Sequence, residues 1–131
     1  MKIMKIMKNR ITFDKAANFG YIYVFNKKYK YKIKETEELE ANELIALDID
    51  KENKIVGLEI FGEEAIYIKN SDISQMYKQI DGSYYFLLVD KPVKSSSIFL
   101  GIEFLFENED YTNFIGYKIL DNEKYKIELL N

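Results

Sequence analysis

The chain has 131 residues, enough for one ordinary domain with its own core, and its 47% hydrophobic content is too high for a disordered protein. Its 11 tyrosines and 9 phenylalanines favour a sheet over helices, because large rings suit a pleated, half-buried surface. The absence of cysteine and histidine excludes disulfides, thiolate nucleophiles, imidazole bases and zinc sites, and a net charge of -3 from mixed charges does not indicate a nucleic-acid-binding protein.

The first eight residues repeat the order methionine, lysine, isoleucine. Their lysines interrupt the unbroken apolar stretch that a signal peptide needs. No later segment approaches the roughly 20 apolar residues of a membrane span. We therefore expect a cytoplasmic protein that makes no contact with a membrane.

The first half begins with two predicted strands. Residues Ile11–Phe13 alternate apolar and polar side chains, and the aromatic run Gly20–Phe25 follows a turn at Asp14–Asn18. Asn26–Lys28 is predicted to be a hairpin connection. The next predicted strand, Tyr29–Lys34, places tyrosine and isoleucine on one face and lysine on the other.

A glutamate-rich segment, Glu35–Glu43, is predicted to be a solvated loop or one or two exposed helical turns. It is followed by two apolar strands, Leu44–Asp50 and Ile55–Phe61. The acidic, asparagine-containing segment Lys51–Lys54 is predicted to be the turn that joins them into a hairpin.

One helix is predicted between the two halves, over residues 71–81. Ser71 or Asp72 would be its N-cap, and Asp81 with Gly82 would end it. A helix of about ten residues is marginal by itself, so its apolar face must pack on the sheet. That face is formed by side chains at positions i, i+3, i+4 and i+7, which are Ile73, Met76, Tyr77 and Ile80.

The second half repeats the pattern of the first. The strand-turn-strand unit at residues 44–61 is echoed at residues 98–120, where 98–106 and 114–120 are the predicted strands, and the aromatic strand Tyr21–Phe25 is echoed at Tyr84–Val89. The short links leave no room for parallel crossovers. The sequence therefore predicts an α+β fold in a single domain, residues 1–131. It is a mostly antiparallel β-sheet from two duplicated three-strand modules, residues 11–62 and 83–129, with one short helix between them.

The first module resembles a small bacterial family catalogued as domain of unknown function 2283. The resemblance is carried by Phe13–Ile22, by Glu35–Glu38 and above all by Leu47–Ile60, and it covers about residues 11–62. The second half resembles the family only through the internal repeat, so it would be a diverged copy. The resemblance implies short open sheets and a partner-binding or antitoxin role.

The chain departs from the family pattern at three places. It has Asn18 where the family has aspartate, Phe19 and Gly20 where the family has alanine and leucine, and Asn53 where the family has glycine. The last change is mild, because asparagine tolerates the left-handed conformation that a hairpin turn needs. The first change weakens any inference of a shared acidic site.

Residues Asp48–Glu59 also have the spacing of a calcium-binding EF-hand loop, with acidic side chains at positions 1, 3, 5 and 12. However, Asn53 stands where the sharp turn needs glycine, and Gly62 would interrupt any exiting helix. The residues from Ile55 onward are β-branched and read as a strand. We favour an acidic hairpin turn between two buried strands, with no metal and no cofactor.

Carboxylates are the remaining candidates for catalysis. Glu59 and Glu103 lie inside apolar strands, where a carboxylate must face solvent, find a cationic partner or change its pKa. A buried cluster formed by Asp14, Asp48 and Glu59 would favour a small carboxylate-based hydrolase or a ligand-binding protein. If its members were scattered on an open face beside a tyrosine-rich patch, they would favour protein binding. The candidate acidic cluster consists of Asp14, Asp48, Asp50 and Glu59.

The candidate binding residues are Tyr29, Lys30, Tyr31 and Lys32. Nucleic-acid binding is disfavoured, because tyrosines and lysines on opposite faces cannot stack bases and contact phosphates together. Exposed tyrosine is a rigid contact residue, and lysine suits an acidic partner. We therefore predict a non-enzymatic protein-binding module, such as an antitoxin, immunity protein or inhibitor of an unidentified protein. A homodimer formed through exposed strand edges is a further expectation.

Overall fold

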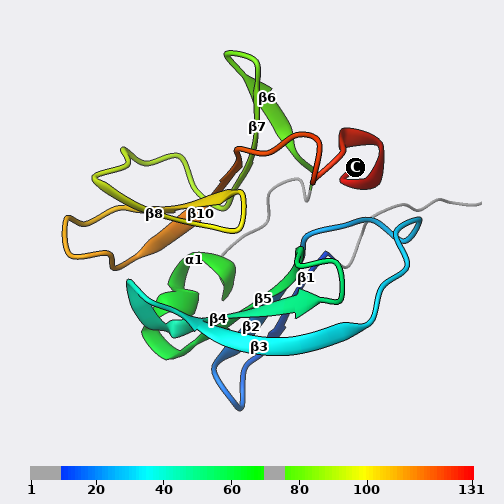
Figure 1. The fold of residues 1–131 in the computed structure, drawn as a ribbon. Helices are drawn as coiled ribbons and strands as arrows, with labels where there is room; N and C mark the ends of the chain where they lie inside the picture. Colours follow the sequence, from blue (N-terminus) through cyan, green and yellow to red (C-terminus); the bar gives the residue numbers. More distant parts are fainter. Residues whose placement is uncertain (1–9, 70–75) are drawn as a thin grey trace, which may run out of the picture.

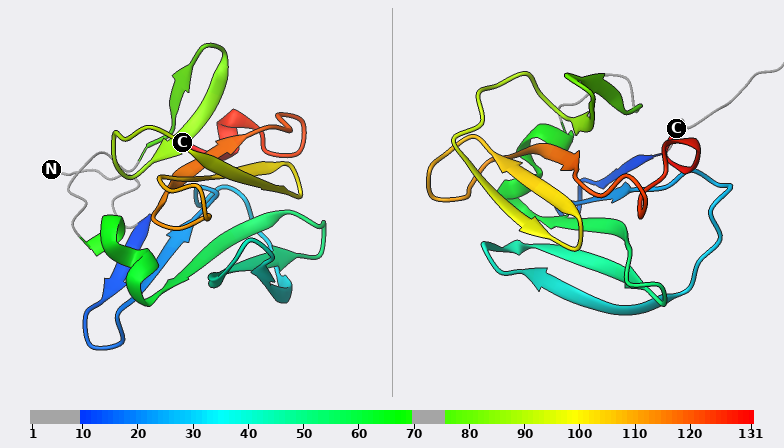
Figure 2. Two further views of the ribbon diagram at one scale, coloured as in Figure 1. Left: turned by 90° about the vertical axis from the view of Figure 1, so that its left-hand side faces the viewer. Right: turned by 45° about the horizontal axis from the view of Figure 1, so that its top comes forward.

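The computed structural model describes residues 10–69 and 76–131, and they form two five-stranded antiparallel sheets stacked in separate layers (Figures 1 and 2). The first sheet has the strand order β1-β2-β5-β4-β3. Its strands are β1 (Ile11–Asp14), β2 (Phe19–Tyr23), β3 (Ile33–Leu39), β4 (Asn42–Asp50) and β5 (Ile55–Phe61).

The second sheet has the order β6-β7-β10-β9-β8, which is the order of the first sheet with every strand replaced by its counterpart five strands later. The C-terminal half is therefore a second, similar sheet, as the internal repeat indicated. Its strands are β6 (Lys78–Ile80), β7 (Ser83–Leu87), β8 (Ser95–Phe99), β9 (Ile102–Phe106) and β10 (Phe114–Ile119).

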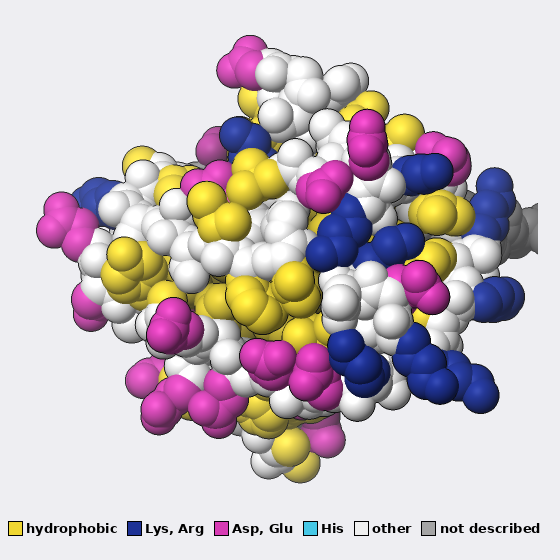
Figure 3. All heavy atoms as spheres, viewed as in Figure 1, with side chains coloured by type: hydrophobic (Ala, Val, Ile, Leu, Met, Phe, Trp, Pro, Cys, Tyr) yellow, Lys and Arg dark blue, Asp and Glu magenta, His cyan; other side chains and the backbone are white. Residues whose placement is uncertain are grey.

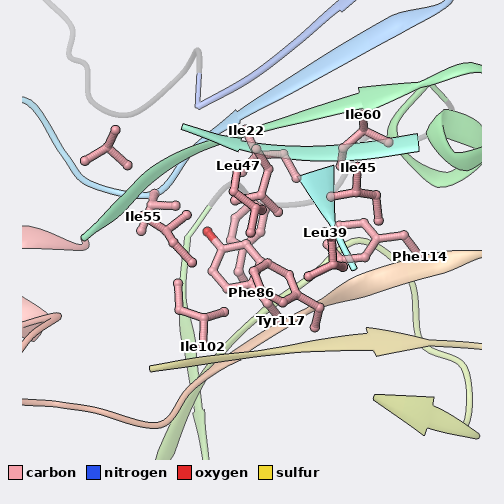
Figure 4. Close-up of a cluster of buried hydrophobic side chains, with 14 of the residues drawn as sticks. Ile22, Leu39, Ile45, Leu47, Ile55, Ile60, Phe86, Ile102, Phe114 and Tyr117 are labelled. Carbon is pink, nitrogen blue, oxygen red and sulfur yellow. The ribbon is translucent and has the colours of Figure 1, made fainter. Parts of the chain in front are cut away.

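The core lies between the inner faces of the two sheets. Figure 4 shows side chains of the first sheet, such as Ile22, Ile45 and Leu47, pointing toward Phe86 and Tyr117 of the second. These residues are fully buried and belong to one cluster. Close packing of two apolar faces is what makes two amphipathic sheets stable together.

Short helical segments lie beside the sheets. The 3-10 helix η1 (Gly62–Ala65) runs directly into α1 (Ile66–Lys69), and a second 3-10 helix, η2 (Ile127–Leu129), lies near the C-terminus. Within the described ranges, no helix is long and apolar enough to cross a membrane.

The predicted three-strand modules were too small, because each sheet has five strands. The unpredicted strands lie toward the sheet edges, where side chains face water and the apolar alternation is lost. Thus Glu35–Leu39, predicted as loop or helical turns, belongs to β3, in which every residue except Leu39 is exposed. The predicted strand 98–106 is instead two strands, β8 and β9, joined by a tight turn at Leu100 and Gly101, both with positive φ.

The predicted helix over residues 71–81 falls partly on residues 70–75, which lie outside the described residues. Its C-terminal part is not helical, because Lys78–Ile80 forms β6. Asp81 and Gly82, which were expected to end a helix, have φ values of 50° and 84° and form the turn of the β6–β7 hairpin. An Asp-Gly pair is also the usual signal for such a turn.

The predicted strand Tyr29–Lys34 was also placed too early. Only Ile33 and Lys34 belong to β3, and the residues before them form an irregular connection. Asn26 holds this connection, because its side-chain oxygen accepts a hydrogen bond from the Lys28 amide at 2.8 Å and its side-chain nitrogen donates to the Glu128 carbonyl at 3.1 Å.

Candidate functional site

The outer face of the first sheet carries an uninterrupted group of polar and aromatic side chains. In β4 the residues Ile45, Leu47 and Ile49 enter the core, so the alternate residues Asp48 and Asp50 point to the opposite face. The register of the sheet then aligns neighbouring strands with Asp48. Thr36 of β3 lies opposite it on one side and Gly57 of β5 on the other.

Asp48 is the centre of this group. Its side chain accepts hydrogen bonds from the Tyr21 hydroxyl and from the Thr36 hydroxyl, both at 2.7 Å. Asp48 is only 4% exposed, so both hydrogen bonds compensate for lost hydration. Burial, followed by the hydrogen bond to Asp48, raises the pKa of Tyr21 far above its ordinary value, so Tyr21 stays a neutral donor.

Glu59 stands next to Asp48 on the same face, opposite Tyr21 on β2 and Ala46 on β4. Its partial burial, its hydrogen bonding to Asp48 and the charge of that carboxylate raise the pKa of Glu59 to about 7. Two neighbouring carboxyl groups avoid repulsion by sharing one proton. Glu59 is therefore a group beside the Asp48 carboxylate whose own protonation changes near neutral pH.

Gly57 makes the contact between Tyr21 and Asp48 geometrically feasible. A Cβ atom at position 57 would overlap the Tyr21 hydroxyl oxygen and crowd its ring. The missing side chain lets the Tyr21 ring lie across β5 and reach β4. Here glycine is needed for space and not for its backbone freedom.

Asp50 binds a second tyrosine and also closes the β4–β5 turn. Its Oδ2 accepts a hydrogen bond from the Tyr29 hydroxyl, and its Oδ1 accepts the amides of Glu52 and Lys54, both at 2.9 Å. Asn53 has a φ of 62°, as the predicted hairpin turn requires. The EF-hand spacing thus belongs to an acidic hairpin, and within the described residues no group of three acidic side chains is placed to hold a metal ion.

The predicted binding residues Tyr29, Lys30, Tyr31 and Lys32 lie together, and we call them the Tyr–Lys surface. They line one shallow depression with Asp50, Lys51 and Glu52. The Tyr29 ring packs on Phe25 with centroids 4.2 Å apart and on Tyr31 at 5.8 Å. Both tyrosines are half-buried and both lysines are exposed.

The candidate acidic cluster is only partly assembled. Asp48 and Glu59 are neighbours, and Asp50 is on the same face beside Tyr29. Asp14 lies on the edge strand β1, where its carboxylate accepts the amides of Ala16 and Ala17 in the β1–β2 turn. Glu103 is in the other sheet, opposite Lys118.

Three members of the site were not predicted from the sequence: Tyr21, Thr36 and Gly57. Tyr21 lies in an aromatic run that predicted a strand but gave no indication of a site. Thr36 was hidden because the glutamate-rich segment around it does not look like a strand. None of the three is close in sequence to Asp48, so the register of the sheet was needed to identify them.

The second sheet does not repeat this site. Aligning the registers around Gly57 and Gly116 puts Leu105 in the place of Asp48 and Lys118 in the place of Glu59. Tyr85 occupies the position of Tyr21, with Lys118 5.6 Å from its ring centre. The duplicated framework therefore carries the carboxyl pair in its first copy alone.

Comparison with known proteins finds one family model that matches the first sheet and one relative that is similar over most of the chain. The family model described as a protein of unknown function, DUF2283, matches residues 10–63, which are nearly the limits of the first sheet with η1. Uncharacterized protein YuzE of Bacillus subtilis (strain 168) is 33% identical over 117 residues, which are 88% of this chain and 89% of that protein. No solved structure gives a significant match. The family-typical run through Asp48 and Glu59 and the relative that spans nearly the whole chain together show that this protein belongs to the DUF2283 family.

Proposed function

We propose that this protein is a non-enzymatic protein-binding module whose Tyr–Lys surface binds an acidic segment of another protein. The observation that carries the proposal is the shared depression, in which two half-buried tyrosines are flanked by exposed lysines. An antitoxin, an immunity protein or an inhibitor would use a surface of this kind, because each acts by covering another protein.

The tyrosines of this surface are held in place before any partner arrives. Tyr29 is fixed by its hydrogen bond to Asp50, by the Phe25 ring and by the Lys54 ammonium group, 4.9 Å from the ring centre. Tyr31 stacks on Tyr29. A contact residue that is already ordered loses little conformational entropy on binding, which favours affinity.

The charge around the depression favours an acidic partner. Residues 27–34 contain five lysines, and Lys51 lines the depression as well. Lysine side chains gather along the right-hand side of the molecule in Figure 3, with few carboxylates between them. Such a field attracts acidic segments and increases the rate of association.

The position of Asp14 argues against the alternative of a carboxylate-based hydrolase. That alternative required a buried cluster of Asp14, Asp48 and Glu59. Asp14 instead caps its own turn at an exposed edge, so the three-residue cluster is not formed. Only Asp48, buried beneath Tyr21, and the half-buried Glu59 lie together, which leaves the hydrolase without its third carboxylate.

The proposal predicts a partner that is lost when the lysines are reversed. Tagged full-length protein captures partners from the native cell lysate, and mass spectrometry with titration calorimetry on the purified partner measures the affinity. We expect the Lys30→Glu/Lys32→Glu variant to weaken binding by roughly tenfold or more, because rim charges now repel. Tyr31→Ala removes a contact ring and is expected to weaken binding without reversing its salt dependence.

The matched control is Lys15→Glu/Lys94→Glu, which makes the same change of net charge at two exposed lysines away from the depression. It should keep the affinity of the unaltered protein. Equal binding by the Lys30/Lys32 variant and this control would contradict the proposal. So would the absence of any stoichiometric partner when the bait is shown by circular dichroism to be folded.

A further inference from the structure

The open edge of the first sheet is the longest one in the described part of the chain. β3 has seven residues, whereas the other edge strands β1, β6 and β8 have four, three and five. β3 pairs with β4 on one side only, and Ile33–Glu38 are all exposed. A long exposed edge leaves backbone donors and acceptors free to pair with another strand.

Charge is separated along this edge. Lys30 and Lys32 precede β3 and Lys34 lies at its start, whereas the second half of the strand is acidic, with Glu37 and Glu38. Along the lower part of Figure 3, where β3 runs in Figure 1, basic side chains gather on the right and acidic side chains on the left. Uniform charge would repel a second copy, but two blocks of opposite charge do not.

Antiparallel pairing of two β3 strands about a two-fold axis brings these blocks together. With the axis at Thr36, the regular stretch Glu35–Glu38 forms the centre of the pairing, and Lys34 of each copy, at the irregularity between Ile33 and Glu35, is nearest to the second copy's Glu38. Lys32 and Glu40, just outside the two ends of β3, are brought near each other in the same way. Parallel pairing would instead place lysine beside lysine. Glu35 of each copy faces the second copy's Glu37, so two like-charge pairs remain in the antiparallel arrangement, each next in sequence to a lysine or glutamate of an attractive pair. This register forms more direct Lys–Glu pairs than a shift of one residue either way.

A hollow at the acidic end of β3 accommodates the incoming lysine. It has a volume of about 430 Å³ and is lined by four glutamates together with Leu39 and Phe99. In the single chain, Lys34 donates to the Asn53 side-chain oxygen at 2.6 Å and lies 3.8 Å from the Glu35 carboxylate, and both of these groups are exposed. Exposed contacts of this kind contribute little, so the side chain can turn to a second copy.

We propose that two copies of this chain associate through antiparallel β3 edges, with Lys34–Glu38 and Lys32–Glu40 pairs on both sides of a two-fold axis, so that the first sheets become continuous. This dimer goes beyond the proposed function, since it needs no external partner. It also protects an edge that would otherwise be open to aggregation.

Charge reversal in the full-length protein tests the proposal. Sedimentation equilibrium is expected to give a dimer for the unaltered chain. Lys34→Glu and Glu38→Lys should each weaken the dimer by roughly tenfold, because either change converts two attractive pairs into repulsive ones. The double variant Lys34→Glu/Glu38→Lys should regain most of the affinity. Amides of β3 should also exchange more slowly with deuterium as protein concentration rises.

The control Lys94→Glu/Glu123→Lys makes the same pair of changes at exposed positions away from β3. It should give the same dimer mass by sedimentation equilibrium as the unaltered protein. A monomer at about 0.1 mM protein, or a double variant that does not recover, would overturn the inference. Lys34 does not line the depression of the Tyr–Lys surface. A monomeric protein that still loses its partner on Lys30→Glu/Lys32→Glu would therefore refute the dimer and leave the proposed function standing.

Discussion

At the scale of single residues, Glu59 is the group whose charge changes near neutral pH, because its pKa is raised to about 7. In the unfolded chain its pKa is close to the ordinary value of 4.5. Between these values the folded state holds a proton that the unfolded state has lost, so the contribution of Glu59 to the free energy of unfolding falls as pH rises from 4.5 through 7.

Glu59→Gln is predicted to remove this fall in the free energy of unfolding with rising pH. The amide cannot ionise, so the variant should be more stable than the unaltered protein at pH 8 by on the order of 1–2 kcal/mol and similar to it at pH 5. Urea unfolding followed by circular dichroism at both pH values measures the difference. Glu52→Gln, at an exposed turn position, is the control and should leave the pH dependence unchanged. Parallel curves of stability against pH for Glu59→Gln and the unaltered protein would count against the raised pKa of Glu59.

At the scale of elements, the two central strands β5 and β10 have glycine at equivalent positions for different reasons. Gly116 lies at a β-bulge with a φ of 153°, and a Cβ there would overlap the backbone of β7. Gly57 is crowded by the side chain of Tyr21. Both sheets therefore have glycine at this position, but a tyrosine side chain excludes a Cβ atom in the first sheet and the neighbouring backbone excludes it in the second.

Gly57→Ala is predicted to displace Tyr21 from Asp48 and to lower the free energy of unfolding by about 2–4 kcal/mol, through overpacking and a lost buried hydrogen bond. Tyr21→Phe alone should cost about 1–2 kcal/mol. Chemical denaturation of both variants and of the double variant completes the cycle. Because Tyr21→Phe removes the most crowded atom, the double variant should cost less than the sum of the single costs. Additive costs would show that Gly57 is required for another reason.

At the scale of the whole molecule, a few buried polar side chains join the two sheets. Glu64 of η1 accepts the backbone amides of Asn113 and Phe114 at 3.1 and 2.8 Å, which fixes the first module to the β9–β10 connection. Arg10, at the start of the first sheet, donates to the Val24 carbonyl at 2.9 Å and to the Leu130 carbonyl near the C-terminus. Arg10, the first described residue, is thereby held to Leu130 near the C-terminal end of the chain.

Glu64→Gln is predicted to destabilise the whole protein by about 2–3 kcal/mol, because Glu64 is buried and accepts one backbone amide on each carboxylate oxygen, and the side-chain nitrogen of glutamine cannot accept a hydrogen bond. Thermal unfolding measured by scanning calorimetry should show one transition shifted to lower temperature. Glu63→Gln, at the exposed neighbouring position, should change the midpoint little. If Glu64→Gln split the transition into two, the sheets would be independent folding units joined only weakly.

The sequence by itself determined the buried strands, the duplication and the family. Strands such as β4 and β5 bury one face or both, so their apolar runs and the Asn53 turn are visible in the chain. Edge strands such as β3 leave no such pattern, because water satisfies their outward side chains and the backbone edge alone makes them strands. β6 is also an exposed edge strand without an apolar pattern. The pair Asp81 and Gly82 was therefore assigned to a helix end, and only the pairing of β6 with β7 identifies it as a hairpin turn.

Only the tertiary structure decided which candidate residues meet. Tyr29, Lys30, Tyr31 and Lys32 are neighbours in sequence, so their common depression was open to prediction. Asp48 meets Tyr21, 27 residues away, only because β5 lies between their strands with Gly57 at the crossing point. Side-chain type limits what a residue can donate, accept or charge, whereas strand order and register determine which donors and acceptors come within 3 Å of each other.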